Sequence, residues 1–176
     1  FQPDPLCLEF DLKIATANLA NYGRPEQLTG TLMVDGEIIA GSRRTALELR
    51  GRLAPVIDPR QLTFELTGST KPFDLTDAPP LAGWLGVEQG LVACTATLTV
   101  KNNVLDPAKS MLKFNFSEAR LAPAARQRLH GIVLPRVFTM SVPLSGNLEA
   151  PRADFTAAIA SLLTSDDVIS SFLEGL

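Results

Sequence analysis

The sequence has few of the residues on which catalytic and metal sites depend. It contains one histidine, His130, with two cysteines, one tryptophan and one tyrosine among 176 residues. A structural zinc site needs four closely arranged Cys or His ligands, which this composition does not supply. The motifs of metalloproteases, serine hydrolases, dinucleotide-binding proteins and P-loop proteins are also missing from the sequence. We therefore expect no catalytic residues, no metal and no cofactor.

Basic residues are in the minority. The chain has 16 Lys and Arg against 19 Asp and Glu, which gives a net charge of −3. Nucleic-acid-binding domains usually carry a basic surface, so we expect no nucleic-acid partner. The arginines that cluster locally are interpreted as solvated faces of strands and of a helix, and contact with anionic head groups is the alternative. These arginines are Arg43, Arg44, Arg50, Arg52, Arg120, Arg126 and Arg128.

Long apolar runs are missing as well. The longest, AAIASLL at residues 157–163, is too short to span a bilayer, and no signal peptide opens the chain. Because the chain begins with Phe1, we expect a fragment of a longer protein whose targeting signal lies outside it. Cys7 and Cys94 lie in strand-like runs, which favours buried free thiols. A single disulfide between them stays open if the compartment is oxidising.

What the sequence has in quantity is a period-two alternation of apolar and polar residues. From residue 6 to residue 14 every second residue is Leu, Phe or Ile, which is typical of a half-buried strand. The DGE at residues 35–37 is a hairpin-turn signal. One apolar and one polar face per strand indicate an antiparallel sheet. Similar alternation recurs at residues 28–34, 45–53, 61–68, 91–103, 111–121 and 137–148.

Helical signals are short and lie between or after the strands. Asp77 is placed to cap a short helix that has Pro79 or Pro80 in its first turn. Residues 122–134 favour a second helix, although Gly131 weakens the pattern. The tail at 153–176 carries two apolar stripes typical of amphipathic helices. The stripes are Phe155, Ile159, Leu162 and Leu163, then Val168, Ile169, Phe172 and Leu173.

These patterns predict one α+β domain over residues 1–176. Its main element is a curved antiparallel β-sheet of long amphipathic strands, shaped as a groove or a roll, with a few short helices. We expect a β-meander in 1–70, a strand-helix-strand-strand-helix-strand unit in 71–152, and C-terminal amphipathic helices in 153–176. A sheet with one apolar face must have that face covered by something.

Two segments carry a resemblance to a known family. FDLTDAPPLAGWLGVEQGLVACTATLTVKNNVLDPAKSMLKFNFSEARL at 73–121 and VPLSGNLEAPRADF at 142–155 are similar to parts of the bacterial AsmA-like proteins of outer-membrane biogenesis. In 6–68 the resemblance extends only to strand character. It implies a periplasmic part of a membrane-anchored cell-envelope protein that uses an apolar β-sheet groove for phospholipid transport or outer-membrane maintenance. Neighbouring segments of the parent chain or envelope proteins are the other partners implied. The family has no catalytic residues to carry over.

Two hypotheses follow for the apolar face. In the first, acyl chains of a phospholipid cover part of it. In the second, the chain is a structural or protein-interaction domain whose own helices cover the sheet. An enzyme, the third possibility, would need a cleft with clustered carboxylates around Asp74, Asp77 or Glu88. The groove candidates in the first hypothesis are Leu8, Phe10, Leu12, Leu47, Leu49, Leu62, Phe64, Leu66, Leu98, Phe114, Phe116, Phe138 and Met140.

Overall fold

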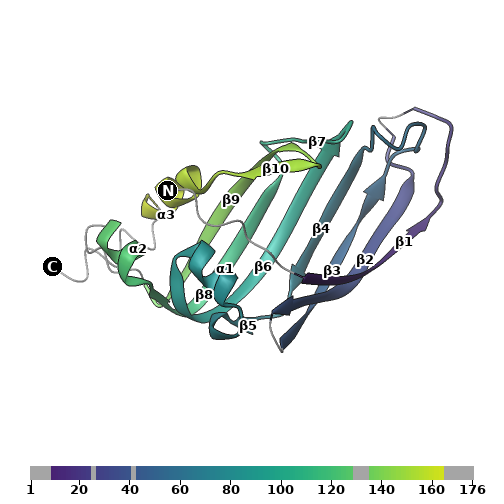
Figure 1. Cartoon of the computed structure of the whole chain (residues 1–176). Coiled ribbons are helices and arrows are strands. Elements are labelled where there is room, and N and C mark those ends of the chain that lie inside the picture. Colours follow the sequence, from purple (N-terminus) through teal and green to yellow (C-terminus); the bar gives the residue numbers. More distant parts are fainter. Residues whose placement is uncertain (1–8, 25–26, 41–42, 129–134, 165–176) are drawn as a thin grey trace.

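A computed structural model of the chain describes residues 9–24, 27–40, 43–128 and 135–164. Within these ranges the fold is one antiparallel sheet with a few short helices, as the alternation predicted (Figure 1). The strands are β1 (Glu9–Ala17), β2 (Gly30–Ala40), β3 (Arg43–Leu53), β4 (Phe64–Thr70), β5 (Phe73–Asp74), β6 (Val87–Lys101), β7 (Val104–Leu105), β8 (Met111–Leu121), β9 (Val137–Asn147) and β10 (Ala150–Ala153). The helices are η1 (Leu75–Asp77), α1 (Pro79–Leu85), α2 (Pro123–Arg128) and α3 (Phe155–Leu163).

The strands follow one another across the sheet with few crossovers. From β1 the order runs through β2, β3 and β4 to β6, which then pairs with β8, and β8 pairs with β9. The short strand β10 forms a hairpin with the end of β9. Figure 1 shows the sheet curling so that β1 comes forward at one end, while α1 and α3 lie at the other end. All strand pairings among the described residues are antiparallel.

The turn predicted at residues 35–37 is wrong, because these residues lie inside β2. Gly36 pairs with Leu12 on one side and with Leu47 on the other. Asp35 and Glu37 project from the opposite face, where arginines of β3 bind both carboxylates. The DGE sequence therefore satisfies the alternation of a strand, and its turn-forming residue types were misleading.

The strand register places apolar side chains on one face of the sheet and polar side chains on the other, across its whole width. One row runs from Ile14 through Val34 and Leu49 to Gly68, and a parallel row joins Leu32, Gly51, Leu66 and Leu98. We call the face that carries these rows the apolar face. Beyond β6 it continues through Phe114 and Met140, which pair across β8 and β9. Thr, Ser, Asp, Glu, Lys and Arg dominate the opposite, polar face.

Three glycines on the apolar face allow the sheet to bend. A Cβ atom placed on Gly36 would lie 2.1 Å from the Asp11 carbonyl oxygen. At Gly51 and Gly68 the corresponding distances to the carbonyl oxygens of Glu65 and Glu48 are both 1.9 Å. No side chain tolerates such an approach, so only glycine lets the neighbouring backbones come this close. Glycines at defined positions are a known means of curving a sheet.

A compact core lies under the helices at one end of the apolar face. Its members come from η1, α1 and α3 and from the strands beneath them, β6, β8 and β9. Phe116 is 1% exposed, and its ring stacks on that of Phe138 with centroids 4.6 Å apart. The helices are fixed by local caps: Asp74 accepts a hydrogen bond from the Thr76 amide (2.9 Å), and Asp154 accepts one from the Ala157 amide (2.9 Å).

Several local predictions need correction. Asp77 does not cap α1; the N-cap is Ala78, although prolines do occupy the first turn as predicted. Pro151, a residue type that usually interrupts strand pairing, lies within β10 opposite Gly146. On α3 the buried residues are Ala158 and Leu162, whereas Ile159 is exposed. Residues 129–134 of the second predicted helix and the second apolar stripe of the tail lie outside the described residues.

Candidate apolar binding surface

The part of the apolar face formed by β1–β4 and the end of β6 has no helix packed on it in the described part of the chain. Instead, η1 and α1 pack against β6, and α3 packs against β9. Leu12 is 43% exposed and Ile14 is 64% exposed, although both point to the same side as the core residues. We call this region the open apolar face. Its incompletely buried side chains are Leu12, Ile14, Leu32, Ile38, Leu47, Leu49, Phe64 and Leu98.

The open apolar face contains buried as well as exposed side chains, and we call the buried ones its floor. Val34, Leu53 and Leu66 are buried within it, so the strands pack closely even where no helix covers them. Glycine takes the place of a side chain at Gly51 and Gly68, directly beside leucines of the neighbouring strands. The result is an apolar surface on which leucines alternate with glycines across neighbouring strands. Such a surface suits a flexible hydrocarbon better than a rigid polar ligand.

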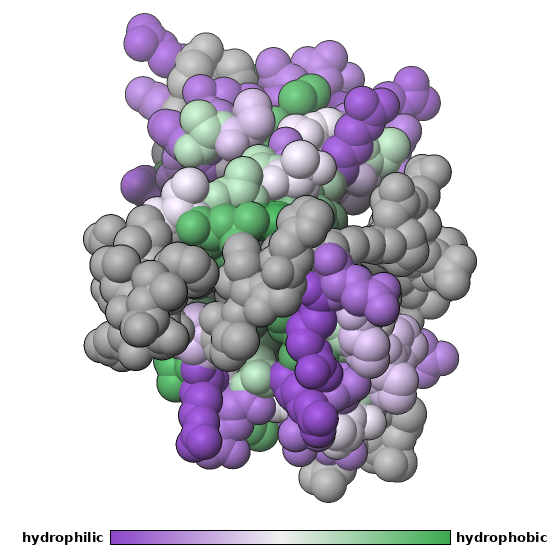
Figure 2. Space-filling view, turned by 90° about the vertical axis from the view of Figure 1, so that its left-hand side faces the viewer, coloured by the Kyte–Doolittle hydropathy of each residue, from purple (hydrophilic) through white to green (hydrophobic). Residues whose placement is uncertain are grey.

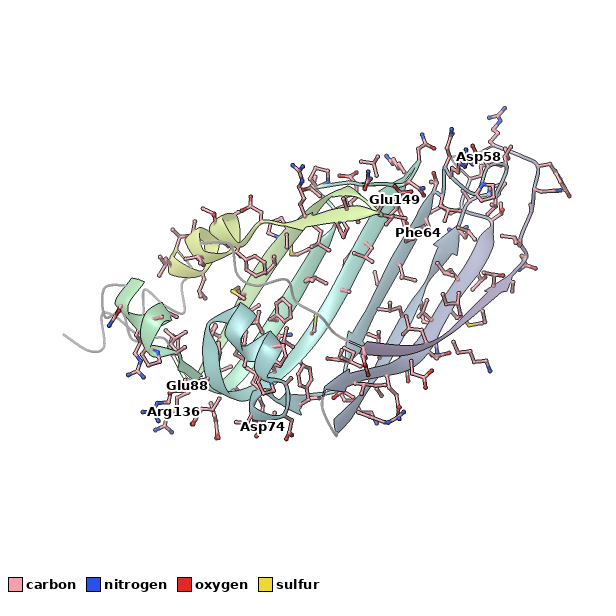
Figure 3. All side chains as sticks on the ribbon, in the orientation of Figure 1. Asp58, Phe64, Asp74, Glu88, Arg136 and Glu149 are labelled. Atoms are coloured by element: carbon pink, nitrogen blue, oxygen red, sulfur yellow. The ribbon has the colours of Figure 1, made fainter. Side chains whose placement is uncertain are left out.

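A cavity of about 310 Å³ lies at one end of this region, between β4 and β6. Phe64, Val100 and Leu28 supply its apolar lining, and the charged residues Lys101 and Glu65 also line it. Its volume is at the lower limit of typical small-molecule sites. Figure 3 places Phe64 toward the upper ends of the strands, whereas Asp74, Glu88 and Arg136 lie at the opposite, lower rim.

Charged side chains lie away from the apolar face. On the polar face Arg50 binds Asp35 (2.6 Å), and Arg44 binds Glu37 (3.0 Å). These pairs are exposed and contribute little to stability. Figure 2 views the molecule from the α2–α3 end, where hydrophobic residues show near the middle of the view and hydrophilic residues lie above and below them. The charges therefore favour water on one side of the sheet and leave the other side apolar.

The structure divides the predicted groove residues into two groups. Leu12, Leu47, Leu49, Phe64 and Leu98 belong to the open apolar face, and Leu66 lies in its floor. Phe114, Phe116, Phe138 and Met140 are buried in the core under the helices, so their assignment to an open groove is corrected.

Three further predicted residues have other outcomes. Leu62 precedes β4, where its amide donates to Asn103 Oδ1 (3.1 Å). Leu8 and the side chain of Phe10 lie outside the described residues.

Sequence reasoning missed three members of the open apolar face. Leu32 and Ile38 belong to β2, and the expected turn at 35–37 broke the alternation that would have connected them. Ile14 lies in the strand that was predicted, but it was not counted among the groove residues. If Gly36 is taken as a residue of the apolar face, the period-two alternation continues without a break from Leu32 to Ile38.

The carboxylates considered for catalysis are engaged in local structure. Asp74 accepts hydrogen bonds from the Thr76 amide and hydroxyl (2.9 and 2.8 Å). Glu88 binds Arg120 at 2.9 Å and Arg126 at 3.8 Å. Among the described residues, no group of three or more His, Cys, Asp or Glu could hold a metal ion. His130 lies outside the described residues.

Cys94 lies on the apolar face of β6, next to the core, and has no disulfide partner among the described residues. Burial raises the pKa of its thiol to about 11, because the charged thiolate is poorly solvated there. Cys7 lies outside the described residues, so a disulfide between Cys7 and Cys94 remains one of the two alternatives given by the sequence.

The raised pKa predicts slow alkylation of Cys94 in the folded protein. An ordinary thiol has a pKa of 9.0, so the thiolate fraction near neutral pH is about a hundredfold lower here. In a Cys7→Ser variant, the rate with iodoacetamide should keep increasing up to pH near 11 and should increase sharply on unfolding. Fast alkylation at pH 8 in the folded state would contradict this burial.

No described helix has the length and apolar character needed to cross a membrane. Comparison with models of protein families, with curated proteins and with solved structures found no match to this chain.

Proposed function

We propose that this chain is a non-catalytic segment of a cell-envelope protein whose open apolar face binds the acyl chains of a phospholipid. One observation carries the proposal: the apolar face spans the sheet, but the described helices pack against β6 and β9 and leave the β1–β4 side without helical cover. Apolar surface that a fold leaves incompletely covered can serve as a binding site. Each methylene removed from water contributes about 0.8 kcal/mol, so a long chain gains much from such a surface.

The similarity of residues 73–121 and 142–155 to AsmA-like proteins supports the same function. Under this proposal the chain acts on the periplasmic side of a membrane-anchored bacterial protein, in phospholipid transport or outer-membrane maintenance. The sheet then provides a continuous apolar path, and the polar face remains in water. Neighbouring segments of the parent chain or other envelope proteins extend that path.

The second candidate is a structural or protein-interaction domain, and a specific observation favours it for part of the sheet. Under η1, α1 and α3 the apolar face is a closed core with Phe116 and Val142 almost fully buried. This half needs no ligand for its stability. We therefore assign the structural role to the β6–β9 half and the lipid-binding role to the β1–β4 half.

Native mass spectrometry with lipid extraction tests the proposal on protein purified from a bacterial host. We expect a co-purifying phospholipid, and we expect the Phe64→Glu variant to lose it because a carboxylate on the apolar face cannot be desolvated cheaply. Thr67→Glu is the matched control: it adds the same charge to the same strand, on the polar face opposite Arg50. It should retain the lipid.

Leu47→Glu gives a second, independent disruption in β3 if Phe64→Glu fails to fold. Far-UV circular dichroism checks that each variant keeps its strand content. A protein without lipid that also fails to bind a fluorescent fatty acid would overturn the proposal. Equal loss of lipid in Thr67→Glu and Phe64→Glu would show that the charge, and not its place on the apolar face, is responsible.

A further inference from the structure

The outer edge of β1 is a long, regular strand edge. β1 is the terminal strand of the sheet, and among the described residues it pairs only with β2, over nine consecutive positions. Natural proteins usually shorten such edges or interrupt them with proline or bulges, because unpaired backbone groups there readily accept another strand. The other side of the sheet follows this rule: β10 has four residues and contains Pro151. β1 contains no proline, and its register with β2 has no shift.

The side chains of β1 are unusually exposed on both faces. Leu12 and Ile14 are 43% and 64% exposed, although they continue the rows of the apolar face. Asp11 and Lys13 are exposed on the polar face. A further strand beside β1 would cover the flanks of the two aliphatic residues and place new partners opposite the two charges.

The sequence of β1 is complementary to itself in one antiparallel register. When Leu12 of one copy lies opposite Leu12 of a second copy, Asp11 of each copy lies opposite Lys13 of the other. The two-fold symmetry of such a pair repeats each charge contact. Antiparallel partners directly opposite each other share a face, so both charge pairs lie on the polar face and the leucines on the apolar face.

The two neighbouring registers that preserve the faces are less favourable. A shift in one direction places Asp11 opposite Asp11 of the second copy, which opposes the two Glu9–Lys13 contacts of that register. A shift in the other direction places Lys13 opposite Lys13. Like charges directly opposite each other destabilise a strand pair. A one-residue slip is excluded for a different reason, since it would place apolar side chains on the polar face.

We propose that β1 is an interface at which two copies of this chain pair edge to edge, in the register centred on Leu12. The paired sheets share one apolar face, which the dimer extends across both copies. This inference goes beyond lipid binding and does not depend on it. The proposal commits to a second copy because the strand matches its own charges, which an unrelated partner strand would match only by chance.

Asp11 and Lys13 also face charged residues of β2 within the same copy, and these contacts affect the test. Asp11 lies opposite Glu37, whose carboxylate binds Arg44, and Lys13 lies opposite Asp35, whose carboxylate binds Arg50. Exchanging the two charges on β1 therefore alters contacts with β2 as well as with the second copy. The stability of each variant has to be measured separately from its association.

A charge-exchange experiment tests the proposal on the 176-residue chain. Sedimentation velocity over a wide concentration range gives the dimer dissociation constant of the parent, Asp11→Lys, Lys13→Asp and the double exchange. Each single change converts both opposite-charge contacts into like-charge contacts, so dimerisation should weaken by about tenfold or more. The double exchange restores opposite charges in the same register, and we expect it to recover most of the loss.

Lys113→Asp is the matched control, because it makes the same charge change on the exposed polar face of β8, inside the sheet. It should leave the dissociation constant unchanged. A parent that stays monomeric at every concentration would overturn the proposal. So would a dimer that the single charge changes do not weaken, or one that the double exchange fails to restore while circular dichroism and thermal unfolding show folded protein.

Discussion

Gly51→Ala is expected to destabilise the protein by about 3 kcal/mol, although it adds a single methyl group. The new Cβ would lie 1.9 Å from the Glu65 carbonyl oxygen and 2.8 Å from the Leu66 Cα. Both obstacles are backbone atoms of β4, so no side chain can move aside to relieve the contact. β3 and β4 would have to separate where they pair, and the hydrogen bonds of both strands would be strained.

Urea denaturation followed by far-UV circular dichroism measures this effect. Gly83→Ala is the matched control, because its Cβ meets nothing within 4 Å and Gly83 lies in α1. Alanine favours a helix over glycine by up to about 1 kcal/mol, so this variant should be slightly more stable. The same substitution thus changes stability in opposite directions at the two sites. Equal free energies of unfolding for Gly51→Ala and the parent would contradict the close approach of the strands.

Phe116→Ala should cost about 3–5 kcal/mol in the free energy of unfolding. Phe116 is 1% exposed, stacks on Phe138 at 4.6 Å and lies 6.3 Å from the ring of Phe114. Its removal would leave a cavity under the helices and abolish the aromatic contacts. Equilibrium urea unfolding measures the change, and Phe116→Leu should lose much less because it fills most of the space.

Phe64→Ala is the comparison that separates the two halves of the apolar face. Phe64 is only partly buried on the open apolar face, so its truncation should cost clearly less than that of Phe116. If both truncations cost the same in lipid-free protein, the open apolar face would have to be as well covered as the core. That result would count against the division of roles proposed for the two halves.

The alternation of apolar and polar residues was sufficient to predict most of the sheet. Leu47, Leu49 and Leu53 share one face of β3 as expected. In β6, every second residue from Val92 to Val100 lies on the same face of the sheet. Alternation works here because each strand meets water on one side only. It failed at Gly36, where local residue types signalled a turn but β2 continues, paired with β1 on one side and β3 on the other.

The division of the apolar face could not be predicted from the same pattern. Phe64 and Phe116 alternate with polar residues in the same way, and both were expected to line a groove. One is partly buried and the other lies beneath the helices, because α1 and α3 pack over only some of the strands. Which strands a short helix covers depends on the path of the chain in space, and periodicity carries no information on that path.

The unequal edges of the sheet also limit how large an assembly can become. A fibre that grows by strand addition needs two compatible edges on every molecule, one to join and one to offer. β1 is long and regular, whereas β10 pairs with only the end of β9 and carries Pro151. Pairing of β1 with β1 joins two molecules and does not by itself continue into a fibre. The proline at the short edge thus acts against polymerisation of a protein that consists mostly of β-sheet.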